Sequence, residues 1–118
     1  MKAWGGIASL ELALAAVWTG ASARGFTRAD MARWMSTAPA RLAGLARKGA
    51  IAAGRDADLV IWQPDAEFVV DPAALQQRHK LTPYAGRRLR GVVRSTLVRG
   101  RRVWNGQRIE DHSTGALL

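Results

Sequence analysis

Residues 47–62, RKGAIAAGRDADLVIW, decide how the rest of the chain is interpreted. The segment ends in the apolar run Leu59-Val60-Ile61-Trp62, which is bounded by turn residues and is typical of a buried strand. Gly49 and Gly54 can adopt positive φ angles, so we predict tight turns at both ends of the short apolar stretch between them. The segment therefore predicts a corner that feeds a buried strand, with helices before it and mainly strands and loops after it.

An amphipathic helix is predicted near the start of the chain. The residues that recur at helical spacing, and so define its buried face, are Ile7, Leu10, Leu14, Val17 and Trp18. Gly25 is placed to end this helix. The same stretch resembles a secretory signal, because small residues at 21–23 could form a cleavage site. Against this interpretation, Glu11 lies in the middle of the apolar segment, and Lys2 is the only charged residue before it. Because the segment is also too short to span a bilayer, we expect a cytoplasmic protein.

Two further short helices are predicted before the corner. Thr27 and Asp30 form a near capping box for the first of them, whose apolar stripe consists of Met31, Trp34 and Met35. Pro39 can open the next helix, over residues 39–45, with Leu42 and Leu45 facing inward. The helices follow one another too closely for a linker, so no flexible boundary is expected between them.

Strands and one loop are predicted after the corner. A turn at residues 63–65 leads to a short strand at 67–70, and Asp71-Pro72 predicts a helix start over 72–77. Residues 78–86 are polar, contain proline and lack a period, which predicts a loop. Two strands, 89–98 and 101–104, are joined by Arg99-Gly100. Their expected buried side consists of Val92, Val93, Leu97, Val98, Val103 and Trp104.

The composition favours one modest packed domain. The chain has 118 residues, of which 48% are hydrophobic. Its formal charge of +9, from 18 basic and 9 acidic residues, suggests an anionic partner. However, nearly all of the basic residues are arginines, in a chain that is also rich in alanine and glycine. We therefore interpret the charge as a general compositional bias of the genome and not as a binding surface. The lack of cysteine excludes disulfides, zinc–thiolate sites and cysteine nucleophiles.

Residues that could carry catalysis are sparse. His79 and His112 are separated by a whole predicted hairpin and do not have metal-binding spacing. Residues 111–113, Asp-His-Ser, are neighbours in sequence, whereas a catalytic triad is a spatial arrangement. Asp56 and Asp58 would share a face of an extended segment, but turn and capping hydrogen bonds are the favoured interpretation. The sequence therefore predicts neither a catalytic residue nor a metal ligand in this chain.

Two features could bind a ligand. Gly5-Gly6 precedes a helix whose N-terminal amides could receive an anionic or carbonyl group, although the spacing is not that of a phosphate loop. The arginines that could follow a nucleic-acid backbone are Arg87, Arg88, Arg90, Arg94, Arg99, Arg101 and Arg102. Exposed aromatics for base stacking are missing if Trp104 faces the core, so we favour arginines that solubilise a sheet edge.

Several segments together resemble cyclic amidohydrolases. Residues 48–62, KGAIAAGRDADLVIW, are similar to the segment in which metal-dependent amidohydrolases return to a small β-sandwich domain. Residues 91–106, GVVRSTLVRGRRVWNG, resemble the paired strands that close that domain. Three further stretches are similar to allantoinases, which are relatives of hydantoinases and dihydropyrimidinases: WGGIASLE at 4–11, HKLTPYAGR at 79–87 and GALL at 115–118.

The resemblance implies an α+β fragment of a larger enzyme. Residues 1–46 would be the last helices of a TIM (β/α)8 barrel, and residues 47–118 the C-terminal strands of the small β-sandwich, including the helix–loop segment 71–88. Members of the family hold two metal ions, zinc or another divalent metal, through a His-x-His pair, a carboxylated lysine, two more histidines and an aspartate. None of these ligands has a counterpart in this sequence.

The resemblance also implies a reaction for the parent enzyme. Metal-activated water would open a cyclic amide ring, and the expected substrate is the cyclic ureide allantoin, which gives allantoate. Only Gly5, Gly6 and Ile7 are expected near the substrate, through backbone groups that hydrogen-bond the ring amide. We expect the chain alone to be inactive and to bind no cofactor.

The full-length parent is expected to be a homo-oligomer, often a tetramer, with no membrane partner and no nucleic-acid partner. Two alternatives remain open: a small basic domain that binds nucleic acid, and an assembly fragment with open strand edges.

Overall fold

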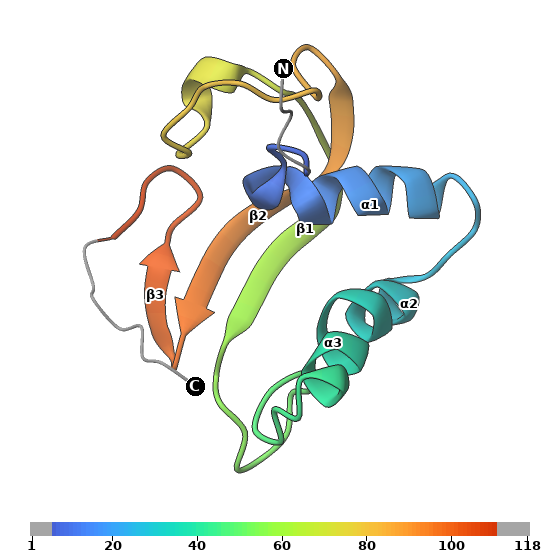
Figure 1. Ribbon diagram of the computed structural model, residues 1–118, viewed down its shortest axis with the longest axis vertical. Helices are drawn as coiled ribbons and strands as arrows, with labels where there is room; N and C mark the ends of the chain where they lie inside the picture. The colour runs from blue at the N-terminus through green and yellow to red at the C-terminus, as the bar shows by residue number, and fades with distance from the viewer. Residues whose placement is uncertain (1–5, 111–118) are drawn as a thin grey trace.

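A helix lies across a three-stranded antiparallel sheet in the computed structural model, which describes residues 6–110 (Figure 1). The elements are the 3-10 helix η1 (Leu10–Leu12), α1 (Ala13–Ser22), α2 (Arg28–Ala32), the π-helical η2 (Arg33–Thr37), α3 (Ala38–Leu42), β1 (Leu59–Val69), the 3-10 helix η3 (Pro72–Ala74), β2 (Arg88–Val98) and β3 (Arg101–Trp104). The sheet order is β1-β2-β3. No helix within residues 6–110 is long and apolar enough to cross a bilayer. The predicted mixture of helices followed by strands is confirmed.

Strand β1 is one long strand where two short strands and a turn are predicted. It pairs with β2 from Leu59 opposite Leu97 to Val69 opposite Arg88, but the pairing skips residues 64–66. Pro64 has no N–H to donate to the ladder, so the chain passes it as a bulge and continues in the same direction.

The prediction that this strand is buried is wrong. Val60 and Ile61 are 51% and 56% exposed. The reason is the place of β1 in the sheet, because it is an edge strand with one neighbour in the described part of the chain. An edge strand without a second layer over it leaves side chains of both faces in contact with water.

Helix α1 crosses the β1–β2 ribbon at this bulge (Figure 1). Trp18 Nε1 donates to the Pro64 carbonyl oxygen at 2.9 Å, and the Arg90 N–H donates to Thr19 Oγ1 at 2.8 Å. The helix thereby supplies partners to backbone groups at the bulge, where the ladder is interrupted. Glycine suits position 91 at this crossing, because its φ is 97° and a Cβ there would lie 3.0 Å from the Trp62 ring.

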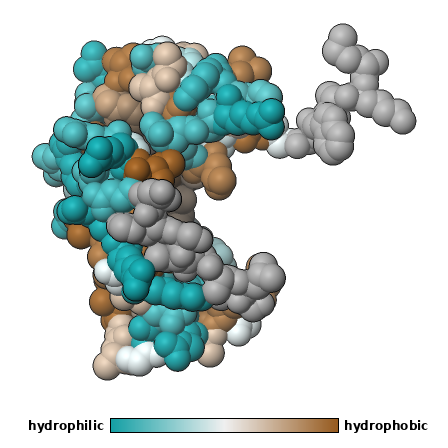
Figure 2. Space-filling view, turned by 90° about the vertical axis from the view of Figure 1, so that its left-hand side faces the viewer, coloured by the Kyte–Doolittle hydropathy of each residue, from teal (hydrophilic) through white to brown (hydrophobic). Residues whose placement is uncertain are grey.

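The core has two small clusters, and apolar side chains also reach the surface between hydrophilic ones (Figure 2). The first cluster contains Leu12, Ala15, Val70, Leu75 and Leu89. The second contains Trp18, Ala21 and Met31, with Trp62 packed edge-on against Trp18 at a ring-centroid distance of 5.4 Å. Both parts of the predicted division, residues 1–46 and 47–118, therefore contribute to the same clusters, and the division itself stays a prediction.

The predicted buried face of the first helix is right only in part, at Trp18, which is buried, and at Leu14, which packs half-buried against the same cluster. Leu10 is 93% exposed and Val17 is 41% exposed, whereas Leu12 and Ala15 are buried. Apolar residues occur around most of the helix, so helical spacing alone defines more than one possible face. The small Ala15 and Ala21 favour the observed face, because they let the helix approach the sheet closely. The predicted end at Gly25 is confirmed, with a φ of 81° and an N–H bond to Ser22.

The second and third predicted helices form one helical run over residues 28–42. The capping box is confirmed, since Thr27 and Asp30 exchange both side-chain-to-backbone bonds. The run accommodates Pro39, near the start of α3, by the π-helical turn η2 that precedes it. At the end of η2, the Ala38 N–H donates to the carbonyl of Arg33, five residues earlier.

This extra π-helical residue rotates the following turn about the helix axis. Ala40 is therefore buried, and Leu42, predicted to face inward, is 90% exposed. Of the apolar stripe predicted for the second helix, Met31 is buried, while Trp34 and Met35 lie at the surface.

The remaining turns follow the predictions closely. Gly49 and Gly54 both have a φ of 81°, as predicted for tight turns. Arg99 and Gly100 have φ angles of 51° and 79°, the conformation of a two-residue hairpin turn. The helix predicted at Asp71-Pro72 is only the single turn η3, and residues 78–86 form a loop.

The side of β2 and β3 predicted to be buried is only half-buried, because no second layer covers it within residues 6–110.

We expect Thr19→Val to lower the free energy of unfolding by about 1–3 kcal/mol, because it leaves the partly buried Arg90 N–H without its acceptor. Urea unfolding followed by circular dichroism measures the change. Thr19→Ser keeps the hydroxyl and is the matched control, with an expected loss below about 1 kcal/mol. Equal losses in the two variants would show that the hydroxyl does not act through this bond.

Candidate functional site

The segment predicted to bind substrate lies just before η1. Gly6 has a φ of 110°, which side chains with L configuration rarely adopt, and a Cβ there would meet open space. Ile7 is 63% exposed, and its carbonyl accepts the Ser9 Oγ hydrogen at 3.4 Å. Gly5 lies outside the described residues. The backbone of Gly6 and Ile7 is therefore accessible at the surface, and its binding of substrate stays a prediction.

Contacts from η1 to the loop after β1 position this segment. The Glu11 carboxylate accepts the Gln76 N–H at 2.8 Å, and Leu12 packs in the same cluster as Leu75. The Lys80 ammonium donates to the Leu75 carbonyl from the same loop. No sequence signal identifies the contact of Glu11, because its partner is 65 residues away along the chain.

A cluster of charged side chains, the charged corner, joins the turns around Gly49 and Gly54 to the start of β1. It consists of Arg47, Lys48, Asp56 and Asp58. Asp56 accepts from Arg47 Nε at 2.9 Å and from Lys48 Nζ at 3.2 Å, and the Lys48 ammonium also contacts the Asp58 carboxylate. Asp56 and Asp58 thus share a side, as their spacing predicts, and the bridging role of Lys48 is not evident from the sequence.

Hydrogen bonds in the charged corner keep its carboxylates ionised. The Lys48 ammonium, followed by the Arg99 N–H at 2.8 Å, lowers the pKa of Asp58. The Arg47 guanidinium and then Lys48 lower the pKa of Asp56. Asp58 and then Asp56 raise the pKa of Lys48. A general acid or base works best with a pKa near the operating pH, so these shifts favour the structural role predicted for both aspartates.

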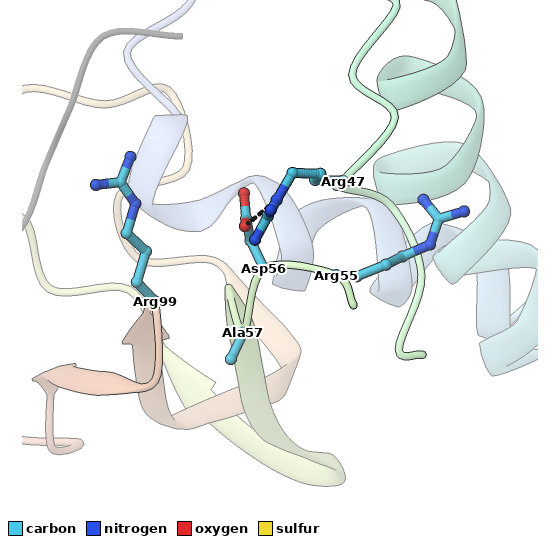
Figure 3. A pocket seen from close by; sticks show the side chains of 5 residues that line it. All are labelled: Arg47, Arg55, Asp56, Ala57 and Arg99. Carbon is cyan, nitrogen blue, oxygen red and sulfur yellow. Dashed lines mark hydrogen bonds and ion pairs between the residues drawn. The ribbon is translucent and has the colours of Figure 1, made fainter. Parts of the chain in front are cut away.

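A pocket opens beside the charged corner, and Figure 3 shows the residues that line it: Arg47, Arg55, Asp56, Ala57 and Arg99. Arg47 is directed at Asp56, while Arg55 points away from Arg99 and donates to the carbonyls of Ala46 and Lys48 at 2.7 and 2.9 Å. The guanidinium groups do not converge on one point, so the pocket is not built to hold an anion.

Arginines of β2 and β3 contact side chains of neighbouring segments. The pairs are Arg88–Glu67 at 3.4 Å, Arg90–Asp65 at 3.2 Å, Arg94–Gln63 at 2.7 Å and Arg102–Glu110 at 3.2 Å. Trp104 is half-buried, and the guanidinium of Arg87 lies 5.8 Å from the Tyr84 ring centre. Pairing with acidic and amide groups across the strands supports the interpretation that these arginines solubilise the sheet.

The described residues do not fit a metal centre. Within residues 6–110, no group of three or more histidine, cysteine, aspartate or glutamate residues could hold a metal ion. His79 lies in the loop after η3, and the stretch 111–113 with His112 lies outside the described residues.

The chain matches a known family along most of its length. The sequence model of the Amidohydrolase family matches residues 5–103. Among curated proteins, the allantoinase of Streptomyces avermitilis is 58% identical over 101 residues, which are 86% of this chain and 23% of that protein. The allantoinase of Arabidopsis thaliana is 42% identical over 119 residues, which are 99% of this chain and 24% of that protein.

Solved structures show the same likeness in three dimensions. The L-hydantoinase (dihydropyrimidinase) of Arthrobacter aurescens has a TM-score of 0.83 and 30% identity, over 92% of this chain and 24% of that protein. A D-hydantoinase structure has a TM-score of 0.76 and 30% identity, over 82% of this chain and 22% of the other. The chain spans about a quarter of the length of the relatives it matches.

We expect Asp58→Asn to lower the melting temperature at pH 7, because it removes the charge that attracts Lys48 but keeps an acceptor for the Arg99 N–H. The folded state lowers the pKa of Asp58 from its ordinary 3.8, so the stabilisation is complete above that pH and is lost as the pH falls through the lowered value. Melting curves from pH 7 to pH 2 should show the gap closing in acid.

Asp65→Asn is the control, because the Asp65 side chain is 80% exposed and a surface ion pair contributes little. A gap for Asp58→Asn that stays constant in acid would show that its effect is not electrostatic.

Proposed function

This chain belongs to the amidohydrolase family, and we propose that it is the C-terminal part of a cyclic amidohydrolase that hydrolyses allantoin to allantoate. The observation that carries the proposal is the likeness to allantoinases along most of the chain, in combination with a fold shared with hydantoinases. The parent enzyme is proposed to act in the cytoplasm on a small cyclic ureide, as a homo-oligomer.

The finer division of the fold is part of this proposal. Residues 1–46 would complete the helical layer of a TIM barrel, and residues 47–118 would provide strands of the small β-sandwich domain. The change from helices to strands at the charged corner supports this division. The half-buried side of the sheet also supports it, because a sandwich needs a second sheet to cover that side.

The proposed contribution of this chain to the reaction is substrate positioning by Gly5, Gly6 and Ile7. A ring amide offers one N–H and one carbonyl, which exposed backbone groups can bind directly. The open space around Gly6 and its positive φ support this role, because a substrate could approach the main chain there without meeting a side chain. The metal centre and the groups that move protons are proposed to lie in the remaining part of the enzyme.

We expect the isolated chain to show no allantoin hydrolysis and to carry no stoichiometric metal, because the described residues offer no ligand cluster. A chimera in which the chain replaces the matching segment of Streptomyces avermitilis allantoinase should hydrolyse allantoin. Allantoate formation and elemental analysis of the purified proteins measure both outcomes. Turnover by the isolated chain, or a folded chimera that holds its metal without turnover, would contradict the proposal.

In that chimera, we expect Gly6→Ala to lower kcat/KM by about tenfold or more, because the strained backbone displaces the groups that bind the substrate. Gly25→Ala is the matched control, since Gly25 also has a positive φ and open space around it but lies at the far end of α1. It should lower the melting temperature and leave kcat/KM unchanged. Equal losses of activity in both variants would indicate a general effect of destabilisation.

A further inference from the structure

The candidate substrate segment, Gly6 and Ile7, is joined to η1 by short-range hydrogen bonds. The Leu12 N–H donates to the Ser9 carbonyl at 2.9 Å, and Ser9 Oγ donates to the Ile7 carbonyl at 3.4 Å. Because these bonds hold the segment against the first helical turn, the place of η1 decides where the exposed backbone of Gly6 and Ile7 lies.

Glu11 connects η1 to a distant part of the chain. Its Oε2 atom accepts the N–H of Gln76, which is 65 positions later, at 2.8 Å. The neighbouring Leu12 is buried in one cluster with Leu75. Apolar burial has no direction, whereas a hydrogen bond from a main-chain N–H to a carboxylate constrains both distance and angle. Glu11 therefore supplies the contact that orients η1 on the loop.

The peptide group that Glu11 contacts is held at both of its ends. The Leu75 carbonyl and the Gln76 N–H belong to the same planar peptide. The Lys80 ammonium donates to this carbonyl, and the Glu11 carboxylate accepts from this N–H. A cation at the oxygen and an anion at the N–H polarise the peptide in the same sense, so each bond strengthens the other. The loop thereby offers Glu11 a fixed donor.

We propose that Glu11 is a positioning residue of the enzyme, which sets the substrate-binding backbone of Gly6 and Ile7 through the peptide between Leu75 and Gln76. The inference rests on the proposed function, which places the substrate at this backbone. Glu11 itself acts at a distance from the substrate, because its carboxylate is engaged with the loop. The helical half and the loop after β1 would thus build the substrate site jointly.

Two substitutions in the Streptomyces avermitilis chimera test this role. Glu11→Ala removes the acceptor and should lower kcat/KM by about tenfold or more, mainly through a higher KM, because the groups that bind the ring amide are displaced. Glu11→Gln keeps an acceptor oxygen at the same reach and should retain kcat/KM within about threefold. An unchanged kcat/KM in Glu11→Ala would overturn the proposal, and so would equal losses in the two variants.

Asp30→Ala is the matched control. The Asp30 carboxylate also accepts a main-chain N–H, that of Thr27 at 2.9 Å, but it caps α2. Its removal should lower the melting temperature and leave both kcat and KM unchanged. A loss of kcat/KM equal to that of Glu11→Ala would show a general effect of destabilisation and would overturn the proposal.

Backbone order measured by 15N relaxation gives a readout that does not need turnover. In the 118-residue chain, the order parameter of the Ile7 amide should fall below about 0.6 in Glu11→Ala and stay at the value of the unaltered chain in Glu11→Gln and Asp30→Ala. Equal order in all of these proteins would overturn the positioning role. A folded, metal-loaded chimera without turnover would instead contradict the proposed function, while the order parameters would still decide the role of Glu11.

Discussion

The missing N–H of Pro64 is the constraint on which the rest of the structure depends. A strand that contains proline cannot complete its ladder, and here the pairing with β2 opens over three residues. Helix α1 closes the opening by donating from Trp18 to the Pro64 carbonyl and by accepting the Arg90 N–H at Thr19. The helical half and the strand half of the chain are thereby held together at one point, and the buried clusters lie on either side of it.

The charged corner also links segments that are distant in sequence, at the other end of β1. Lys48 holds Asp56 and Asp58, and Asp58 in turn accepts the N–H of Arg99 in the turn between β2 and β3. The segment that most clearly indicates the family is therefore a structural joint, and its lowered carboxylate pKa values suit ion pairing better than proton transfer. The family and the chemistry are carried by different residues, so a strong family signal here does not mark a catalytic site.

Much of the local structure could be predicted because its causes are local. The capping box at Thr27, the end of the helix at Gly25 and the turn at Arg99-Gly100 each depend on residues within a few positions. The substrate-binding role of Gly6 and Ile7 comes from the resemblance and stays a prediction, which the structure supports only by exposing their backbone. The contacts of Glu11 and Lys48 could not be predicted from the sequence. The partner of Glu11 is distant in sequence, and several acidic residues were possible partners for Lys48.

The sequence by itself determined that helices precede strands, the turns at Gly49, Gly54 and Arg99-Gly100, the family and the scarcity of metal ligands. Only the tertiary structure decided that β1 continues through Pro64, that α2 and α3 form one run, and which face of α1 is buried. Propensity and spacing describe what a segment can do alone, whereas these three outcomes depend on what lies beside it. A proline is tolerated where a neighbouring helix satisfies the backbone, and an apolar face is buried only where a partner reaches it.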